Sequence, residues 1–262
     1  IASFLPVGAI SHIYYADRLN QLPLAIYGIA LGIVLLPSLS KAIKQSDQET
    51  TNNIQNRSIE FSLLISLPSA IGLFILAEPI IHILFERGAF VAEDTLYTAK
   101  VLSYFALGLP AYIIIKVLVS CFFAREDTKT PLYISIVSVI TNVVLSLLLI
   151  GSMREMGIAL ATAISAWINA LLLYVFLYTR NLIQFDDILV KNSFKIFINS
   201  TILFVAIYVL NGALFNNIIE NSVLVNSGLL LLMIFLAIII YFALVIVLKV
   251  LTINQLREYL KK

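Results

Sequence analysis

Seven apolar segments, each long enough to cross a lipid bilayer, follow one another along the chain and constrain its fold. A membrane-spanning helix needs about 20 mainly apolar residues. The expected spans cover approximately residues 8–38, 58–77, 96–123, 132–150, 157–178, 194–215 and 227–250. Hydrophobic residues make up 61% of the chain and charged residues 12%, whereas a soluble domain is about half apolar and a quarter charged. The sequence therefore predicts an all-α, polytopic membrane protein with about seven transmembrane helices.

Short polar connections separate the expected spans. Residues 40–57 are predicted to form a polar loop, and residues 78–92 a short amphipathic piece that ends in a turn at Gly88. Twelve of the 17 Lys and Arg residues lie in one alternating set of connections, against three in the other set. The basic set comprises 40–57, 124–131, 179–195 and the tail from 249. Because cytoplasmic loops are enriched in Lys and Arg, we expect this set and the C-terminus to be cytoplasmic.

The first residues, IASFLPVGAI, are apolar but have no positively charged region and no cleavage site, so they do not resemble a signal peptide. We expect them to be the tail of a helix that starts upstream, in a longer protein. Cys121 is the only cysteine of the chain, which excludes an intrachain disulfide. We expect it to be a small buried side chain.

Residues 14–41, YYADRLNQLPLAIYGIALGIVLLPSLSK, carry the adjacent ionised residues Asp17 and Arg18 inside a predicted span. A charge at membrane depth costs at least about 2.5–3.5 kcal/mol, so such residues usually face water or a partner. Helical spacing places Tyr14, Arg18 and Gln21 on one face, and the planar donors of an arginine suit phosphate. We expect this face to line a transport pathway. Alternatively, the charged pair lies near the outer interface and extends its polar ends into water.

Prolines and glycines inside the spans suggest bending points. Pro23, Gly28 and Gly32 lie in the first expected span and Pro110 in the third. Bent or broken helices recur in transporters that alternate their access, so we expect these four residues to act as hinges. The glycine pair alternatively only permits close helix packing. Lys116 is a second candidate cation for the same cavity, or it reaches the cytoplasmic interface.

A further polar set in the fourth and fifth spans either bonds neighbouring helices or binds a cation. Its members are Thr141, Asn142, Ser146, Thr162 and Ser165. The set contains no carboxylate, which weakens the cation hypothesis.

No motif predicts catalysis, so we expect no catalytic residue and no enzyme. A Gly-rich phosphate loop, a Ser/His/Asp order and a CxxC pair are missing from the sequence, and no basic stripe indicates nucleic acid. His12 and His82 lack neighbours at metal-ligand spacing, and we expect both at the membrane interface. Asp186 and Asp187 are the sole support for a rival hypothesis, a membrane-embedded transferase acting on polyprenyl lipids.

Residues 14–41 resemble the eighth-span signature of the MurJ (MviN) lipid II flippases, a YYADRL…P…G(I/V)ALG…LLPSLS run. ERGAF (86–90) resembles the family's FxxGxF turn, and KVLVSCFFAREDTKTP (116–131) its cytoplasmic junction. GIALATAISAWINALLL (157–173) resembles its twelfth span. The resemblance covers essentially the whole chain.

The resemblance implies the fold of the MOP exporter superfamily, in which fourteen spans form two lobes around a central cavity. Residues 1–180 would then be the C-terminal lobe, from the end of span seven to span twelve. Residues 181–262 would hold spans thirteen and fourteen, which form a groove for a lipid tail, and a cytoplasmic tail.

The resemblance also implies a function. Such a protein moves lipid II, the undecaprenyl-pyrophosphate-linked peptidoglycan precursor, from the inner to the outer leaflet of the bacterial cytoplasmic membrane by alternating access. The implied partners are lipid II, membrane lipids and the N-terminal lobe of the same protein, with no nucleic acid and no cofactor. The residues that match the substrate cavity of the family are Arg18, Asp17, Gln21, Tyr14 and Lys116.

Asn142 and Thr162 fall where two ligands of the family's sodium site would be, which implies Na⁺ as a possible coupling ion. Ser146 stands where a site carboxylate is expected, which argues against sodium coupling, and Gln21 stands where relatives can carry an acid, which argues against a proton relay. Two other readings stay open. One is another exporter of the superfamily, for drugs or a lipid-linked polysaccharide, and the other is a non-functional fragment.

Overall fold

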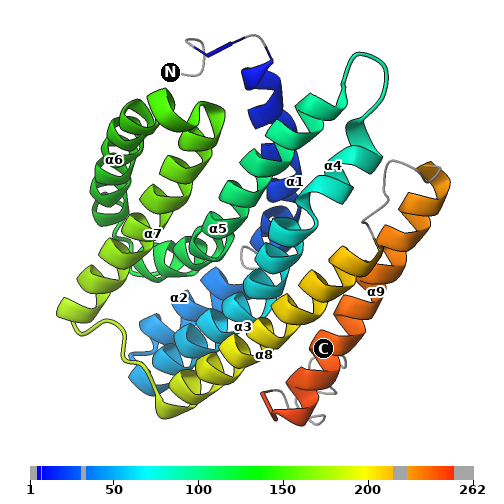
Figure 1. Cartoon of the computed structure of the whole chain (residues 1–262). Helices are drawn as coiled ribbons and strands as arrows, with labels where there is room; N and C mark the ends of the chain where they lie inside the picture. The colour runs from blue at the N-terminus through cyan, green and yellow to red at the C-terminus, as the bar shows by residue number, and fades with distance from the viewer. Residues whose placement is uncertain (1–4, 7, 31–33, 215–222, 251–262) are drawn as a thin grey trace.

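The computed structural model describes residues 5–6, 8–30, 34–214 and 223–250, which form a bundle of helices (Figure 1). The helices are α1 (Ala9–Ala30), α2 (Leu36–Lys44), α3 (Gln48–Ile75), α4 (Ala77–Phe85), α5 (Ala92–Phe123), α6 (Lys129–Met153), α7 (Glu155–Thr179), α8 (Asp187–Leu214) and α9 (Val223–Val247). No strand occurs in the described part of the chain, and the all-α prediction is confirmed.

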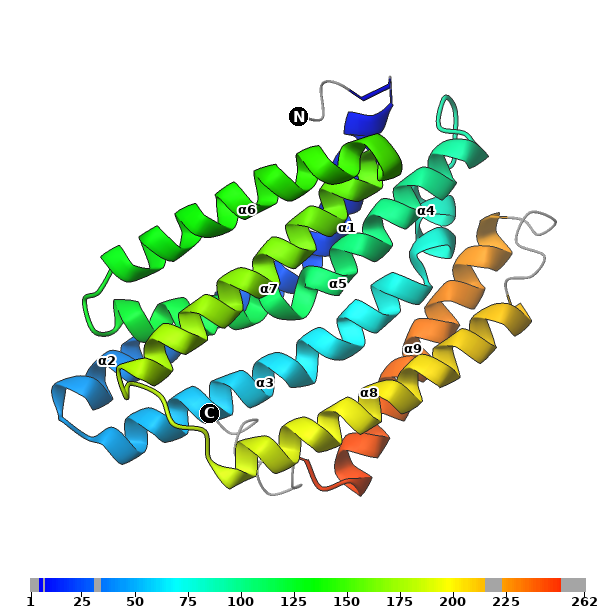
Figure 2. The ribbon, with the colours of Figure 1, turned by 60° about the vertical axis from the view of Figure 1, so that its left-hand side comes forward.

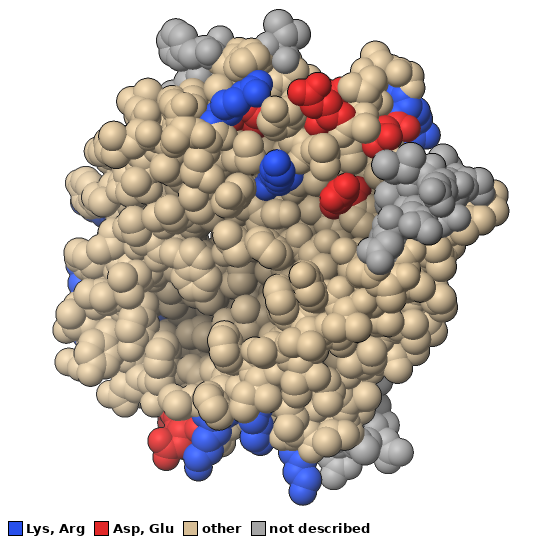
Figure 3. Space-filling view, viewed as in Figure 1, with Lys and Arg blue, Asp and Glu red and all other residues tan. Residues whose placement is uncertain are grey.

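Six of the described helices, α3 and α5 to α9, are long and apolar enough to cross a membrane. They correspond to the second to seventh expected spans. The first corresponds to α1, a 22-residue helix that carries Asp17 and Arg18 and is not among the six. On the face shown in Figure 3, charged side chains gather toward two opposite ends and leave a wide band of other residues between them. The protein is therefore a multi-pass membrane protein.

The predicted loop 40–57 is largely wrong, because α2 continues to Lys44 and α3 begins at Gln48. Asp47 starts α3 by accepting a hydrogen bond from the backbone N–H of Thr50 at 2.9 Å, which satisfies a donor that has no partner within the helix. The polar first turns of α3 also bury one face. The predicted short piece after the second span is confirmed as α4, and the turn that follows it contains Gly88 at φ +65°.

Helix α5 lies at the centre of the bundle, since 61% of its most apolar segment is buried, against 39% or less for the other five span-length helices. It packs against α7, α3, α1 and α4. Gly108 permits the approach of α7, because a Cβ atom at this position would lie 2.9 Å from the Cα atom of Ala163. Helices α8 and α9 pack on α3 and α4 instead, and Figure 2 shows them on the far side of α3 from α6 and α7. The Tyr241 hydroxyl on α9 donates to the Leu64 carbonyl on α3 at 2.7 Å.

Asp127 joins the start of α6 to the end of α7. Its carboxylate accepts hydrogen bonds from the backbone N–H of Thr130 at 3.0 Å, from the Thr130 hydroxyl at 2.7 Å and from Arg180 at 3.0 Å. The bonds from Thr130, followed by the Arg180 contact, lower the pKa of Asp127 below its usual value. A carboxyl group whose pKa is lowered on folding stabilises the fold above its unfolded pKa of about 3.9, and this contribution is lost as the pH falls through the folded value.

We therefore expect Asp127→Asn to lower the melting temperature of the purified protein at neutral pH, and the difference from wild type to shrink as the pH falls from about 5 to about 3. The measurement is thermal unfolding in detergent across this range. Glu126→Gln, an exposed neighbour in the same loop, is the control. A difference that is independent of pH would show that the ionised carboxylate does not carry this contact.

Candidate functional site

A cavity of about 590 Å³ opens between α1, α5 and α7. Helix α1 supplies Asp17, Asn20, Gln21, Leu24, Ala25 and Gly28, and the other two helices supply Phe105, Tyr112, Lys116 and Thr162. The α1 residues recur at intervals of three and four, so one helical face forms one wall. The cavity thus holds one carboxylate and one ammonium group in an otherwise neutral lining.

The structure brings Asp17, Gln21 and Lys116 to this cavity, as the sequence predicts for a polar pathway. The Gln21 amide donates to the Asp17 carboxylate one helical turn away. Lys116 forms no ion pair with any residue that the structure describes, and its side chain is exposed. It lies over Gly28, where an added Cβ would lie 3.7 Å from the ammonium nitrogen. Gly28 thus lies within van der Waals range of the Lys116 side chain, whose ammonium group pairs with no carboxylate of the described residues.

Arg18 and Tyr14 do not line the cavity. Both are exposed, and Arg18 donates to the Tyr14 hydroxyl at 2.9 Å with its guanidinium 4.8 Å from the centre of the Tyr14 ring. Successive residues of an α-helix are turned by about 100°, so Arg18 lies to one side of the wall that contains Asp17. Of the three residues predicted to share one face, Gln21 thus lines the cavity, whereas Tyr14 and Arg18 lie beside it.

The expected hinge residues occupy different surroundings. Pro23 lies inside α1 and Pro110 inside α5, and both helices continue through them. Pro110 is buried in the bundle centre, whereas Gly28 lies in the cavity wall. Gly32 lies outside the described residues.

Three members of the polar set, Asn142, Thr162 and Ser165, form a hydrogen-bond network between α6 and α7. The Asn142 amide nitrogen donates to the Thr162 hydroxyl oxygen at 3.0 Å and to the Ser165 hydroxyl oxygen at 3.3 Å. Thr162 in turn donates to the Ile158 carbonyl. A sodium ion needs oxygen atoms that face it with their lone pairs, but here an N–H donor faces both hydroxyls and the set contains no carboxylate. Asn142 and Thr162 are thus engaged in a contact between two helices, and no group of three or more His, Cys, Asp or Glu residues in the described ranges could hold a metal.

His12 is buried in the first turns of α1, with 6% of its surface exposed. Its Nδ1 atom lies 3.1 Å from a Glu155 carboxylate oxygen on α7, and its Nε2 atom 3.0 Å from an Asp94 carboxylate oxygen on α5. Arg154 approaches Glu155 from the other side at 3.6 Å. Sequence reasoning missed this cluster, because its partners are 82 and 143 residues from His12.

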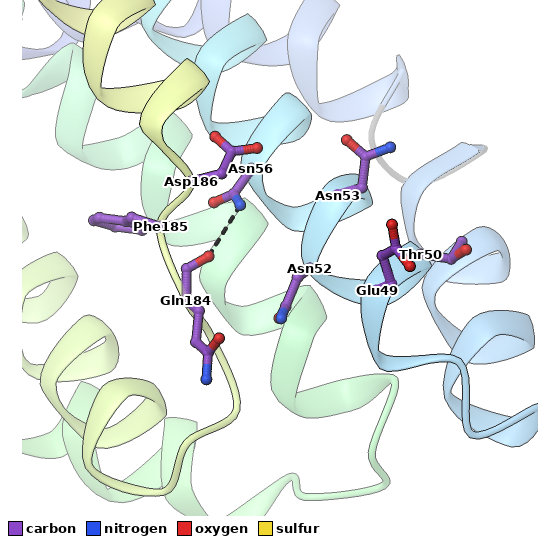
Figure 4. A pocket seen from close by; sticks show the side chains of 8 residues that line it. All are labelled: Glu49, Thr50, Asn52, Asn53, Asn56, Gln184, Phe185 and Asp186. Carbon is purple, nitrogen blue, oxygen red and sulfur yellow. Dashed lines mark hydrogen bonds between the residues drawn. The ribbon is translucent and has the colours of Figure 1, made fainter.

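A second cleft, of about 520 Å³, lies at the end of the bundle that carries the basic connections (Figure 4). Within it, the Asn56 amide donates to the Gln184 carbonyl at 2.9 Å and holds the segment before α8 against α3. Asp186 accepts two 2.7 Å hydrogen bonds from Arg57 and one of 2.6 Å from the Leu189 N–H. The carboxylate that the transferase hypothesis requires is thus engaged in structural contacts.

Comparisons with known proteins agree with this architecture. Residues 1–234 match the family model described as lipid II flippase MurJ. A probable lipid II flippase MurJ from Rhizobium tropici is 40% identical over 256 residues, which are 97% of this chain and 48% of that protein. A probable lipid II flippase MurJ from Rickettsia prowazekii is 48% identical over 174 residues, or 66% of this chain and 34% of that protein.

A solved structure of a lipid II flippase MurJ in an inward closed conformation superimposes with a TM-score of 0.76 at 29% identity. The match covers 93% of this chain and 48% of that one. The chain therefore spans about half the length of the relatives it matches. With a family model that covers most of its length and these relatives, the chain belongs to the lipid II flippase MurJ family.

Proposed function

We propose that the chain is the C-terminal half of a lipid II flippase and forms one wall of the cavity through which the headgroup of lipid II passes. The observation that supports this most is the free ammonium group of Lys116 in a cavity of a membrane-embedded bundle. An unpaired cation inside a membrane protein is costly unless an anion passes it. The pyrophosphate of lipid II is such an anion.

Each cavity residue has a role in this proposal. Lys116 attracts the pyrophosphate electrostatically, and Asp17 holds Gln21 so that its amide faces the cavity. Arg18, at the edge, is held by Tyr14 with its guanidinium exposed. The family's other lobe would face this side, so that Arg18 and Lys116 grip the pyrophosphate from two directions. Pro23 and Pro110 each remove one helical hydrogen bond, and we assign them as the points at which α1 and α5 bend as access alternates. No bond is made or broken.

The remaining helices support the same assignment. Helices α8 and α9 expose large apolar side chains along their length, among them Phe197, Val205, Leu231 and Phe235. We place the undecaprenyl tail against these exposed apolar side chains. The basic connections and the C-terminus face the cytoplasm, in the bacterial inner membrane.

Arg18→Ala in the full-length protein is expected to abolish growth of a bacterial strain depleted of its own lipid II flippase. Removing the guanidinium takes away a charge-assisted contact to phosphate, worth about 1.5–3 kcal/mol. Complementation is the measurement, with Arg87→Ala, an exposed arginine in the turn after α4, as the control. Normal growth of Arg18→Ala would refute this role of Arg18, and failure of the wild-type protein to restore lipid II translocation would refute the function.

A further inference from the structure

His12 joins the three helices that enclose the cavity. It lies in the first turns of α1, and its two ring nitrogens contact Asp94 in the first turn of α5 and Glu155 in the first turn of α7. The Tyr97 ring of α5 stacks on the imidazole, with centroids 5.7 Å apart. This contact lies at the end of α5 opposite the loop that follows Phe123.

The geometry selects one protonation state of the ring. A carboxylate only accepts hydrogen bonds, and a neutral imidazole carries only one N–H. With both carboxyl groups ionised, the two contacts are hydrogen bonds at once only if both nitrogens carry a proton, which is the imidazolium form. Arg154 adds one positive charge, lying 3.6 Å from Glu155 and donating to the Tyr97 hydroxyl at 3.3 Å. The two negative charges of the carboxylates are therefore balanced by the positive charges of the guanidinium and the imidazolium.

From this geometry we infer that His12 is a proton-binding latch that ties α1 to α5 and α7 when it is protonated and releases α5 when it is not. The two carboxylates that contact His12 differ in their exposure to water. The Glu155 side chain is fully buried, whereas the Asp94 side chain is 30% exposed. After deprotonation the one remaining N–H stays with Glu155, which water cannot reach, and Asp94 becomes hydrated. The link between α1 and α5 opens while the link between α1 and α7 persists.

The latch acts on the cavity through the helices it joins. His12 lies five residues before Asp17 on α1, about 7.5 Å along the axis. Helix α5 carries Lys116 on the other side of the same cavity. Opening the link at the first turns of α1 and α5 lets these helices part at one end of the cavity. The inference concerns the helices alone and holds whichever cargo passes.

The test measures the distance between α1 and α5 as a function of pH. Spin labels are placed at Ile10→Cys and Leu96→Cys, both exposed positions, in the full-length protein with Cys121→Ala, reconstituted in lipid nanodiscs. The distances are recorded at intervals from about pH 5 to about pH 8, the range over which an imidazole can change its charge. We expect the ratio of short to long distances to fall about tenfold over this range, as loss of one charge-assisted hydrogen bond implies.

Two variants make the test specific. Asp94→Asn offers both a donor and an acceptor, so it pairs with either form of His12, and we expect short distances at every pH. His82→Gln alters the other histidine of the chain, which contacts Glu86 at 2.9 Å, and should respond like wild type. A wild-type distance that does not change with pH, an Asp94→Asn response equal to wild type, or loss of the response in His82→Gln would each overturn the latch.

Discussion

Replacing Glu155 by alanine is expected to lower the free energy of unfolding of the protein by about 3–5 kcal/mol, because removal of one partner leaves buried charges uncompensated. The Glu155 side chain is fully buried between His12 and Arg154. Without it, the imidazolium loses one of its two acceptors and the guanidinium loses its neighbouring carboxylate. The alanine side chain also leaves a space at the first turn of α7.

Chemical unfolding in detergent, followed by tryptophan fluorescence and circular dichroism, measures the loss for Glu155→Ala. Glu93→Ala is the matched control, since this exposed glutamate lies in the first turn of α5. A surface change of this kind stays within about 0.5 kcal/mol. Glu155→Gln keeps an acceptor for His12 and should fall between the two. Equal stability of Glu155→Ala and Glu93→Ala would show that the cluster contributes nothing to folding.

The sequence predicts the architecture well wherever hydropathy alone determines it. Six spans are found close to their expected positions because each buries apolar side chains over a length that the bilayer fixes. It fails for residues 40–57, whose polar composition predicts a loop. There the first turns of α3 are helical because Asp47 caps them and because Asn56 bonds the distant carbonyl of Gln184. The composition of residues 40–57 gives no information about the contact with Gln184, which lies far away in the sequence.

In the candidate site, too, contacts between residues close in the sequence are predictable, and contacts between different helices are not. Asp17 and Gln21 are predicted together and found together, since helical spacing brings them within one turn. Lys116 joins them from α5, which sequence spacing alone does not determine. Arg18 is separated from Asp17 because adjacent helical residues point in different directions. The two acidic partners of His12 come from other helices, so the sequence offered no signal for the latch.

Lys116→Ala in the full-length protein is expected to reduce lipid II translocation about 10–100-fold, the factor that corresponds to one charge-assisted contact of about 1.5–3 kcal/mol. The lysine makes no ion pair with a described residue, so its removal should leave the melting temperature unchanged, which separates transport from folding. Translocation is measured in vesicles that contain fluorescent lipid II, together with complementation of a depleted strain.

Two further substitutions, each at a lysine of α5, show whether the loss of translocation arises from the missing charge in the cavity. Lys116→Arg keeps the positive charge beside Gly28 and should retain most of the activity, since an anion is attracted by either cation, although the guanidinium is larger and planar. Lys100→Ala removes an exposed lysine from the same helix, about 24 Å nearer its start, and should transport like wild type. If Lys116→Ala transports at the wild-type rate while Arg18→Ala does not, the pyrophosphate contacts the edge of the cavity rather than its wall. The Lys116 ammonium group would then serve to balance the charge of Asp17, the one carboxylate in the lining of the same cavity.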